Sequence, residues 1–369
     1  MSYHKATGWL LLCDITGYTA FLTGSELEHA HEILADLMRG LIGSARTPLR
    51  TVKTEGDALF SYAPADDVAD GRVVIDRIED AYHAFRMQLF NIARSSTCTC
   101  AACANAGNLD LKFMLHFGEF VVHDLTGHDD LQGSDVILVH RLLKNDVRER
   151  LGRPAYLLCT DAARERIPGL SWIDHVETYE HLGAVPCGVR CMHAAFAELE
   201  ASGAADVSPE AADASTSFEV PAPPRVAWEW HVDEDKAPKW QSGLSGWRIA
   251  QNAEGRLRPG ATVHCVHGAD TKSRKVLSWR PYSSFTAEAP TFRSFPPHRF
   301  TMTFEPLEGG KRTRVRWLFK MADRSLKSRF FAWLLRLMIG RVARKNAAKL
   351  AEVLTGGPPL VTGAVQPAP

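Results

Sequence analysis

The fold of this chain is decided by two stretches, CDITGYT at residues 13–19 and KTEGDALF at residues 53–60. Asp14 follows the apolar segment 9–12, and Asp57 lies at the tip of a predicted hairpin over residues 49–63. Paired carboxylates at such turns suit Mg²⁺, whose remaining ligands are waters and phosphate oxygens, and two such ions can stabilise both oxygens of a phosphoryl transfer. The alternative is that each Asp merely caps a helix or a turn.

The segments around these stretches predict a first domain of mixed type. In chain order they indicate a strand at 9–12, a helix after Ser25, the hairpin at 49–63, a second helix at 73–93, strands at 109–123, a helix at 134–147 and further strands at 155–159 and 176–179. This order predicts an α+β sandwich with helices on one face of a largely antiparallel sheet.

The order and spacing of the motifs resemble the catalytic domain of class III nucleotide cyclases, over about residues 8–195. Two further pieces extend the likeness: Gly118-Glu119 at the end of a strand, and GSDV at residues 133–136 at the start of a helix. The resemblance implies a ferredoxin-like class III cyclase sandwich that converts ATP to cyclic AMP and pyrophosphate. It makes Asp14 and Asp57 the pair that binds two Mg²⁺ or Mn²⁺ ions per site, with the backbone carbonyl of Ile15 as a further ligand.

The same resemblance implies a set of substrate contacts. Lys53 and Asp130 fall where the family's adenine-selecting Lys and Asp stand, and their hydrogen-bond polarity suits adenine N1 and the exocyclic amine. Arg141 matches the arginine that stabilises charge on the transferring phosphate. The alternatives are a solvated charge on an edge strand for Lys53, a loop cap for Asp130 and a surface charge for Arg141.

One position departs from the family pattern. The family's transition-state Asn lies four residues before the arginine, where this chain has Ile137, which cannot donate a hydrogen bond. His140 lies on the same predicted helical face and could supply a donor, or it could be an ordinary surface or interface histidine. Because the family's pocket forms between two cyclase domains and this chain has one, the resemblance implies a homodimer. A catalytically weak or inactive sensor that binds nucleotide or a hydrophobic molecule remains the alternative.

Three cysteines form a cluster in the segment that follows the second helix. Cys98, Cys100 and Cys103 could ligate a structural Zn²⁺, with Cys187, Cys191 or a histidine as the fourth ligand. The cluster lacks the paired CxxC spacing of a strong zinc signature, so reduced solvent-facing thiols and redox sensing stay open as alternatives.

Charge and tryptophan content place a domain boundary near residue 200. Residues 1–200 hold 18 Lys and Arg against 28 Asp and Glu, residues 201–369 hold 25 against 15, and seven of the nine tryptophans follow the boundary. We expect a cyclase-like domain at 1–200, a flexible linker at 201–216, a second domain at 217–355 and a disordered tail at 356–369.

The second domain resembles the SRPBCC (START-like) helix-grip fold, on the basis of Trp-rich strands and a long final helix at about 326–354. The resemblance implies a cavity for a lipid or another hydrophobic small molecule, which could regulate the first domain. The alternative is that the tryptophans fill a solid core.

Composition excludes some partners and places. The chain has 43 Lys and Arg and 43 Asp and Glu, a balance that argues against nucleic acid as a partner. Its longest apolar run, at 330–339, is shorter than the ~20 residues of a spanning helix, and the N-terminal residues lack the features of a secretory signal. We expect a cytoplasmic protein without a transmembrane segment.

Overall fold

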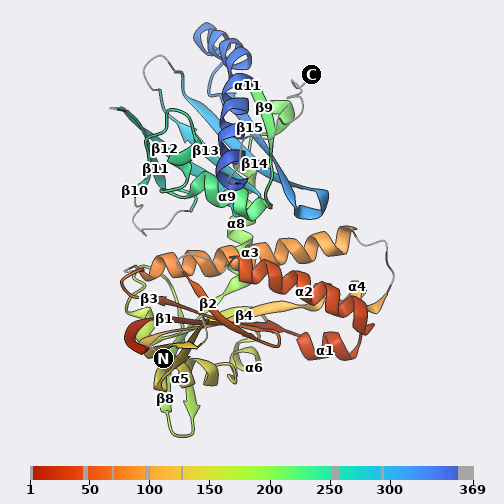
Figure 1. The fold of residues 1–369 in the computed structure, drawn as a ribbon, viewed down its shortest axis with the longest axis vertical. Coiled ribbons are helices and arrows are strands. Elements are labelled where there is room, and N and C mark those ends of the chain that lie inside the picture. Colours follow the sequence, from red (N-terminus) through yellow and green to blue (C-terminus); the bar gives the residue numbers. More distant parts are fainter. Residues whose placement is uncertain are drawn as a thin grey trace. The chain divides into compact units, whose positions relative to one another are not determined.

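Two compact units, Met1–Ala197 and Glu198–Pro369, make up the chain (Figure 1). The computed structural model describes residues 3–44, 49–68, 70–95, 98, 100–125, 128–250, 258–268, 270–291 and 295–355. The tail predicted to be disordered, 356–369, lies outside the described residues.

The first unit is built on one sheet. Its strands are β1 (Tyr3–Thr16), β2 (Arg50–Glu55), β3 (Ala58–Pro64), β4 (Asp110–Leu125), β5 (His128–Gln132), β6 (Tyr156–Thr160), β7 (Ile173–Tyr179) and β8 (Gly183–Cys191). They lie in the order β2-β3-β1-β4-β6-β8-β7, with β5 paired to β4 off this path. Only β4 and β6 pair in parallel among these described strands. The predicted α+β class with a largely antiparallel sheet is confirmed.

Helices cover both faces of this sheet, whereas the sequence predicted one. The helices are α1 (Tyr18–Thr23), α2 (Leu27–Ser44), α3 (Gly71–Ser95), α4 (Ala101–Asn105), α5 (Ser134–Arg141), α6 (Val147–Leu151) and α7 (Asp161–Arg164). A further helix, α8 (Met192–Ser202), begins in this unit and ends in the second. Trp9 and Leu11 of β1 face a core formed with α2 and α3, while Leu10 and Leu12 face a second core formed with α5. In Figure 1, α2 and α3 lie on one side of the sheet and α5 on the other. Because successive strand side chains point to opposite faces, this continuously apolar strand must be covered on both sides.

Two predicted elements differ in extent from the observed ones. The expected strand pair at 109–123 is the single long strand β4, and the expected helix at 134–147 ends at Arg141. A turn follows α5, in which Asn145 donates to the carbonyl of Leu142, and α6 begins at Val147. Local side-chain bonds of this kind compete with helix propagation.

The second unit is a fully antiparallel sheet with a long final helix. Its strands are β9 (Ala214–Val220), β10 (Gly246–Ala250), β11 (Thr262–His267), β12 (Asp270–Arg280), β13 (Ser284–Ala289), β14 (His298–Leu307) and β15 (Arg312–Met321). The order is β10-β11-β12-β13-β14-β15-β9. The helices α9 (Pro224–Val232) and α10 (Ala237–Trp240) precede β10, and α11 (Leu326–Thr355) packs on β9 and β15 (Figure 1). This is the predicted helix-grip arrangement.

Residues 201–216 are structured, in contrast to the flexible linker that their composition predicted. They comprise the end of α8, two short 3₁₀ turns and the start of β9. The Asp206 carboxylate accepts hydrogen bonds from Arg280 (2.6 Å), Ser284 (2.8 Å) and Thr286 (2.6 Å). These partners lie more than 70 residues away in sequence, so composition alone could not indicate that the segment is ordered.

Candidate functional site

Asp14 and Asp57 lie where the pairing of β1 with β3 ends. Asp14 is the last residue of β1 to pair with β3, opposite Ala58, and Asp57 directly precedes Ala58 in the β2–β3 turn. Gly56 has a φ of 64°, a left-handed conformation that glycine adopts without steric cost. The hairpin predicted around Asp57 is confirmed, and it brings Asp57 close enough to Asp14 for the two carboxyl groups to interact electrostatically.

The environment of the pair suits a divalent cation. Burial, followed by the charge of Asp14, raises the pKa of Asp57 to about 6. Two half-buried carboxylates this close repel one another, and an added cation would relieve that repulsion. The groups that could hold Mg²⁺ or Mn²⁺ are therefore the carboxylates of Asp14 and Asp57 and the backbone of Ile15, which lies one residue past the last β1–β3 pair.

Sequence reasoning missed Lys112, which supplies the positive charge at this pair. Lys112 lies opposite Asp14 in the β1–β4 ladder, with its Nζ 3.0 Å from Asp14 Oδ2, and it donates to the carbonyl of Leu143 at 3.4 Å. The sequence pattern at 109–123 predicts that Lys112 lies in a strand, but only the register of β1 against β4 shows that it lies beside Asp14.

Lys53 lies in a second group, near the C-terminal end of the edge strand β2. Its Nζ is 2.7 Å from Glu55 Oε1, and the other oxygen of Glu55 is 3.9 Å from His140 Nδ1. The ring of His140 packs on Phe60 with centroids 4.8 Å apart. Burial lowers the pKa of His140, so its imidazole is neutral at pH 7.

Asp130 lies on β5, in register with His123 of β4, and β5 contacts β2. The structure thus brings the strand that carries Asp130 against the strand that carries Lys53. These two residues remain predictions as adenine contacts.

Helix α5 carries Ile137 and Arg141 on its exposed side. Ile137 is 56% exposed, an unusual position for a large aliphatic side chain, and Arg141 is exposed at the last position of the helix. The start of α5 is fixed by Asp135, whose Oδ2 accepts the backbone N–H of Glu119 at 2.6 Å. The motif residues Gly118-Glu119 and GSDV therefore hold α5 against β4.

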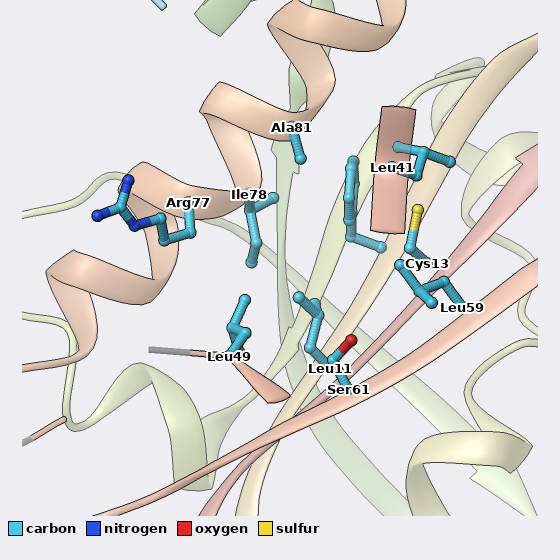
Figure 2. A pocket seen from close by; sticks show the side chains of 10 residues that line it. Leu11, Cys13, Leu41, Leu49, Leu59, Ser61, Arg77, Ile78 and Ala81 are labelled. Atoms are coloured by element: carbon cyan, nitrogen blue, oxygen red, sulfur yellow. The ribbon is translucent and has the colours of Figure 1, made fainter. Parts of the chain in front are cut away.

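The core of the first unit offers no room for a nucleotide in the pocket drawn in Figure 2. That pocket lies between the sheet and α3 and has a volume of about 20 Å³, about enough for one water. Leu11, Cys13 and Ile78 are among its lining side chains. Burial raises the pKa of the Cys13 thiol, next to Asp14 in β1, well above its usual range.

The three clustered cysteines meet a histidine from α2. His29 Nδ1 lies 3.0 Å from Cys100 Sγ, 3.8 Å from Cys103 Sγ and 3.9 Å from Cys98 Sγ. The four ligand atoms all lie within 4.8 Å of one another. The two cysteines predicted as alternative fourth ligands lie elsewhere, since Cys187 and Cys191 belong to β8.

A second cluster of metal-ligand type lies at Asp146, His175 and Glu177. His175 Nε2 is 2.6 Å from Glu177 Oε1 and 3.2 Å from Asp146 Oδ1. His175 is hydrogen-bonded to Glu177, whereas Asp146 Oδ1 is buried with no hydrogen-bond partner among the described residues.

The second unit contains a cavity of about 710 Å³ between α11 and the sheet, a size typical of small-molecule sites. Most of its lining is apolar, from Trp317, Phe319, Phe331, Leu334, Leu335, Met338, Ile339 and Val342. Lys272, Arg274, Lys327 and the buried His298 also line it. Trp228, Trp240 and Trp279 instead pack in the solid core. The second unit thus has a cavity, as predicted, while several of its tryptophans fill a core, as the alternative held.

Comparisons with known proteins match each unit separately. Residues 34–150 match a family described as "protein of unknown function (DUF2652)", and residues 211–355 match the family "polyketide cyclase / dehydrase and lipid transport". An uncharacterised protein of Mycobacterium tuberculosis, Rv2561/Rv2562, is 34% identical over 132 residues. That match covers 36% of this chain and 59% of the relative's length.

The solved structures similar to this chain include nucleotide cyclases. A bacterial light-regulated adenylyl cyclase is 12% identical, covering 51% of this chain and 52% of that chain with a TM-score of 0.39. The adenylyl cyclase CyaB from P. aeruginosa is 14% identical, covering 52% and 96% with a TM-score of 0.39. The guanylyl cyclase Cya2 is 13% identical, covering 52% and 95% with the same TM-score. Among the helices that the structure describes, none combines the length and hydropathy of a membrane span.

Proposed function

We infer that the first unit is an adenylate cyclase that converts ATP to cyclic AMP and pyrophosphate. The observation that carries this proposal is the proximity of Asp14 and Asp57 at the end of β1, with Lys112 as their neighbouring positive charge. Bound divalent cations would polarise the α-phosphate and stabilise the leaving pyrophosphate.

The chain's own residues would position the substrate. Lys53 would donate to adenine N1 and Asp130 would accept from the exocyclic amine. Arg141 would stabilise charge on the α-phosphate while the ribose 3′ oxygen attacks in line and pyrophosphate departs. The strands β2 and β5 and the exposed face of α5 would contribute these residues to the Asp14/Asp57 half of a second copy, as a homodimer requires. His140 belongs to α5 as well, and its role as a hydrogen-bond donor to the substrate stays a prediction.

The test is cyclase assay of the full chain with ATP or GTP and Mg²⁺ or Mn²⁺. We expect cyclic AMP from the native chain, at least a hundredfold less from Asp57→Asn, and no change in Asp36→Asn, which removes an exposed carboxylate on α2. Ile137→Asn should raise turnover, because a single donor to developing charge contributes about 2.7–4 kcal/mol. No cyclic product from the native chain or from Ile137→Asn under any of these conditions would refute the proposal.

The cavity of the second unit favours a second candidate function, binding of an apolar molecule with an anionic group. Arg274 Nε is buried and has no hydrogen-bond partner among the described residues, and Arg274 lies with Lys272 on the cavity side of β12. A carboxylate or phosphate head at that point would satisfy the guanidinium while its chain fills the apolar part. Such a ligand could regulate the first unit, or the chain could act as a sensor without turnover.

Oleate and oleyl alcohol have the same hydrocarbon chain and differ in the head group. Comparing their binding tests whether the cavity prefers an anionic head. We expect oleate to quench tryptophan fluorescence with at least about tenfold tighter binding than the alcohol, since hydrogen bonds to charged groups contribute about 1.5–3 kcal/mol. Arg274→Met should abolish the difference, and Lys275→Met, on the exposed side of β12, should keep it. Equal binding of the two probes, or binding of neither, would contradict an anionic ligand.

A further inference from the structure

The cluster around His29 joins two segments that lie far apart in sequence. His29 belongs to α2, and the three cysteines belong to the segment between α3 and β4, about 70 residues later. Glu26 adds a second link, since its carboxylate accepts the backbone N–H groups of Ala101 (3.3 Å) and Ala102 (3.1 Å). The start of α4 is therefore tied to the start of α2 at this point.

The distances from His29 Nδ1 to the three sulfurs are close to those of a tetrahedral metal site. With Zn–S bonds of about 2.3 Å and a Zn–N bond of about 2.0 Å, tetrahedral ligands lie about 3.5–3.8 Å apart. His29 Nδ1 lies 3.0, 3.8 and 3.9 Å from the three sulfurs, and these distances scatter around the tetrahedral range. Nε2 lies 3.8 Å from Cys103 Sγ. Nδ1, which is within 4 Å of all three sulfurs, is thus the nitrogen placed to act as a ligand.

One of the three sulfurs accepts a backbone hydrogen bond. The backbone N–H of Cys103 donates to Cys100 Sγ at 3.4 Å, a contact that stabilises negative charge on sulfur. None of the three cysteines is in a disulfide.

We propose that His29, Cys98, Cys100 and Cys103 bind one Zn²⁺ ion, which fixes the segment after α3 onto α2. Three sulfurs and one imidazole nitrogen form a complete Cys₃His set, with no open position for substrate, so the site is structural. The soft thiolate ligands select Zn²⁺ over the Mg²⁺ or Mn²⁺ proposed at Asp14 and Asp57, which prefer oxygen. The two metal sites are therefore chemically distinct.

The test measures metal in the full-length chain purified under reducing conditions without chelator. We expect one zinc per chain in the native protein, and a loss of more than about a hundredfold in zinc affinity for Cys100→Ser and for His29→Ala, because loss of a mere outer-sphere partner already costs about 10–100-fold. Cys191→Ser, at a partly exposed cysteine of β8, and His31→Ala, at an exposed histidine of α2, are the matched controls and should bind zinc as the native chain does.

Cobalt substitution of the native chain gives a readout that needs no variant. Co²⁺ bound by three thiolates in a tetrahedral site shows sulfur-to-cobalt charge-transfer bands and intense visible bands, and we expect both at one equivalent of Co²⁺. A chain that binds no zinc and shows no thiolate–cobalt bands would overturn the proposal, and so would equal losses in Cys100→Ser and Cys191→Ser. Formation of disulfides among the three cysteines in place of metal binding would assign them to redox chemistry and also overturn it.

Discussion

The ammonium group of Lys112 offsets one of two carboxylates that lie close together. The side chains of Lys112 and Asp14 are 21% and 18% exposed, so their ion pair is partly buried and screened less than a surface pair. We expect Lys112→Met to lower the free energy of unfolding by about 1–2 kcal/mol in the absence of divalent cations, because Asp14 and Asp57 then repel one another without a neighbouring cation. Adding Asp57→Asn to Lys112→Met should restore part of this loss.

Urea unfolding of the single and double variants measures both effects. The control is Lys5→Met, which removes a pair with Glu119 whose side chains are 66% and 61% exposed, and it should change stability by less than about 0.5 kcal/mol. Equal effects of Lys112→Met and Lys5→Met, or no coupling between Lys112 and Asp57, would show that the ammonium does not balance the carboxylate pair.

His231 makes the stability of the second unit depend on pH. Its Nδ1 donates to the carbonyl of Ala227 at 2.6 Å, its Nε2 is buried with no hydrogen-bond partner among the described residues, and burial lowers its pKa to about 4. An unfolded histidine has a pKa near 6.5, so between pH 6.5 and 4 the unfolded chain binds more protons and stability falls as the pH falls. The loss should reach about 3 kcal/mol below pH 4.

The measurement is urea unfolding at several pH values, with tryptophan fluorescence as the signal. His231→Phe removes the titrating group from a site already packed by Phe218, Trp240 and Phe304, and its unfolding free energy should lack this part of the acid dependence. Identical pH profiles of the native and variant chains would contradict the assignment.

Single residues differ in how far the sequence reveals them. Asp14 and Asp57 could be paired from the sequence only through the resemblance of their motifs to class III nucleotide cyclases, because each alone also fits a helix cap or a turn. His29 could not be chosen among the 15 histidines of the chain, because its link to the cysteines exists only in the packing of α4 against α2. Arg274 carries no local motif, and its role depends on the cavity that α11 closes.

At the scale of elements, Gly118 fixes how α5 lies against β4. A Cβ atom on Gly118 would clash with the Asp135 carboxylate and approach His116 Nε2 to 2.7 Å. Gly118→Ala should therefore displace the Asp135 carboxylate from the Glu119 N–H and lower the free energy of unfolding by about 1–3 kcal/mol. Because α5 carries Arg141, cyclase turnover should also fall.

Gly107→Ala is the matched control, since a Cβ there has no atom within 4 Å. It should stay within about 0.5 kcal/mol of the native chain in urea unfolding and keep its turnover. If Gly118→Ala were as stable and as active as Gly107→Ala, the contact between Asp135 and β4 would not set the position of α5.

Elements were predictable where their pattern is local. Helix α3 and the β2–β3 hairpin follow from apolar periodicity and a glycine turn. Strand β8 has Pro186 and glycines at 183 and 188, which local propensity disfavours, and its pairing with β6 and β7 overrides that preference. The side of the sheet that α5 covers follows from β1, because the apolar run of β1 is buried on both sides. Such a run indicates two covered faces only once the strand is known to lie in the middle of the sheet.

At the scale of the whole molecule, the proposed cyclase needs two copies of the chain. One chain would supply the Asp14/Asp57 half of a site and its partner the half with Lys53, Asp130 and Arg141, so a two-fold dimer would contain two sites. Asp57→Asn then damages one half of a site and Arg141→Ala the other half, and each variant alone should be inactive.

A mixture of the two inactive variants should regain activity. In a mixed dimer one site carries both lesions and the other carries neither, and random exchange of equal amounts should restore about a quarter of the native turnover. The control is a mixture of Asp57→Asn with Asp14→Asn, which damage the same half and should leave every site broken. Cyclic AMP production after mixing and subunit exchange measures the effect, in the Ile137→Asn background if native turnover is low. Activity no higher than the sum of the separate variants would mean that Arg141 does not serve the Asp14/Asp57 pair of a partner chain.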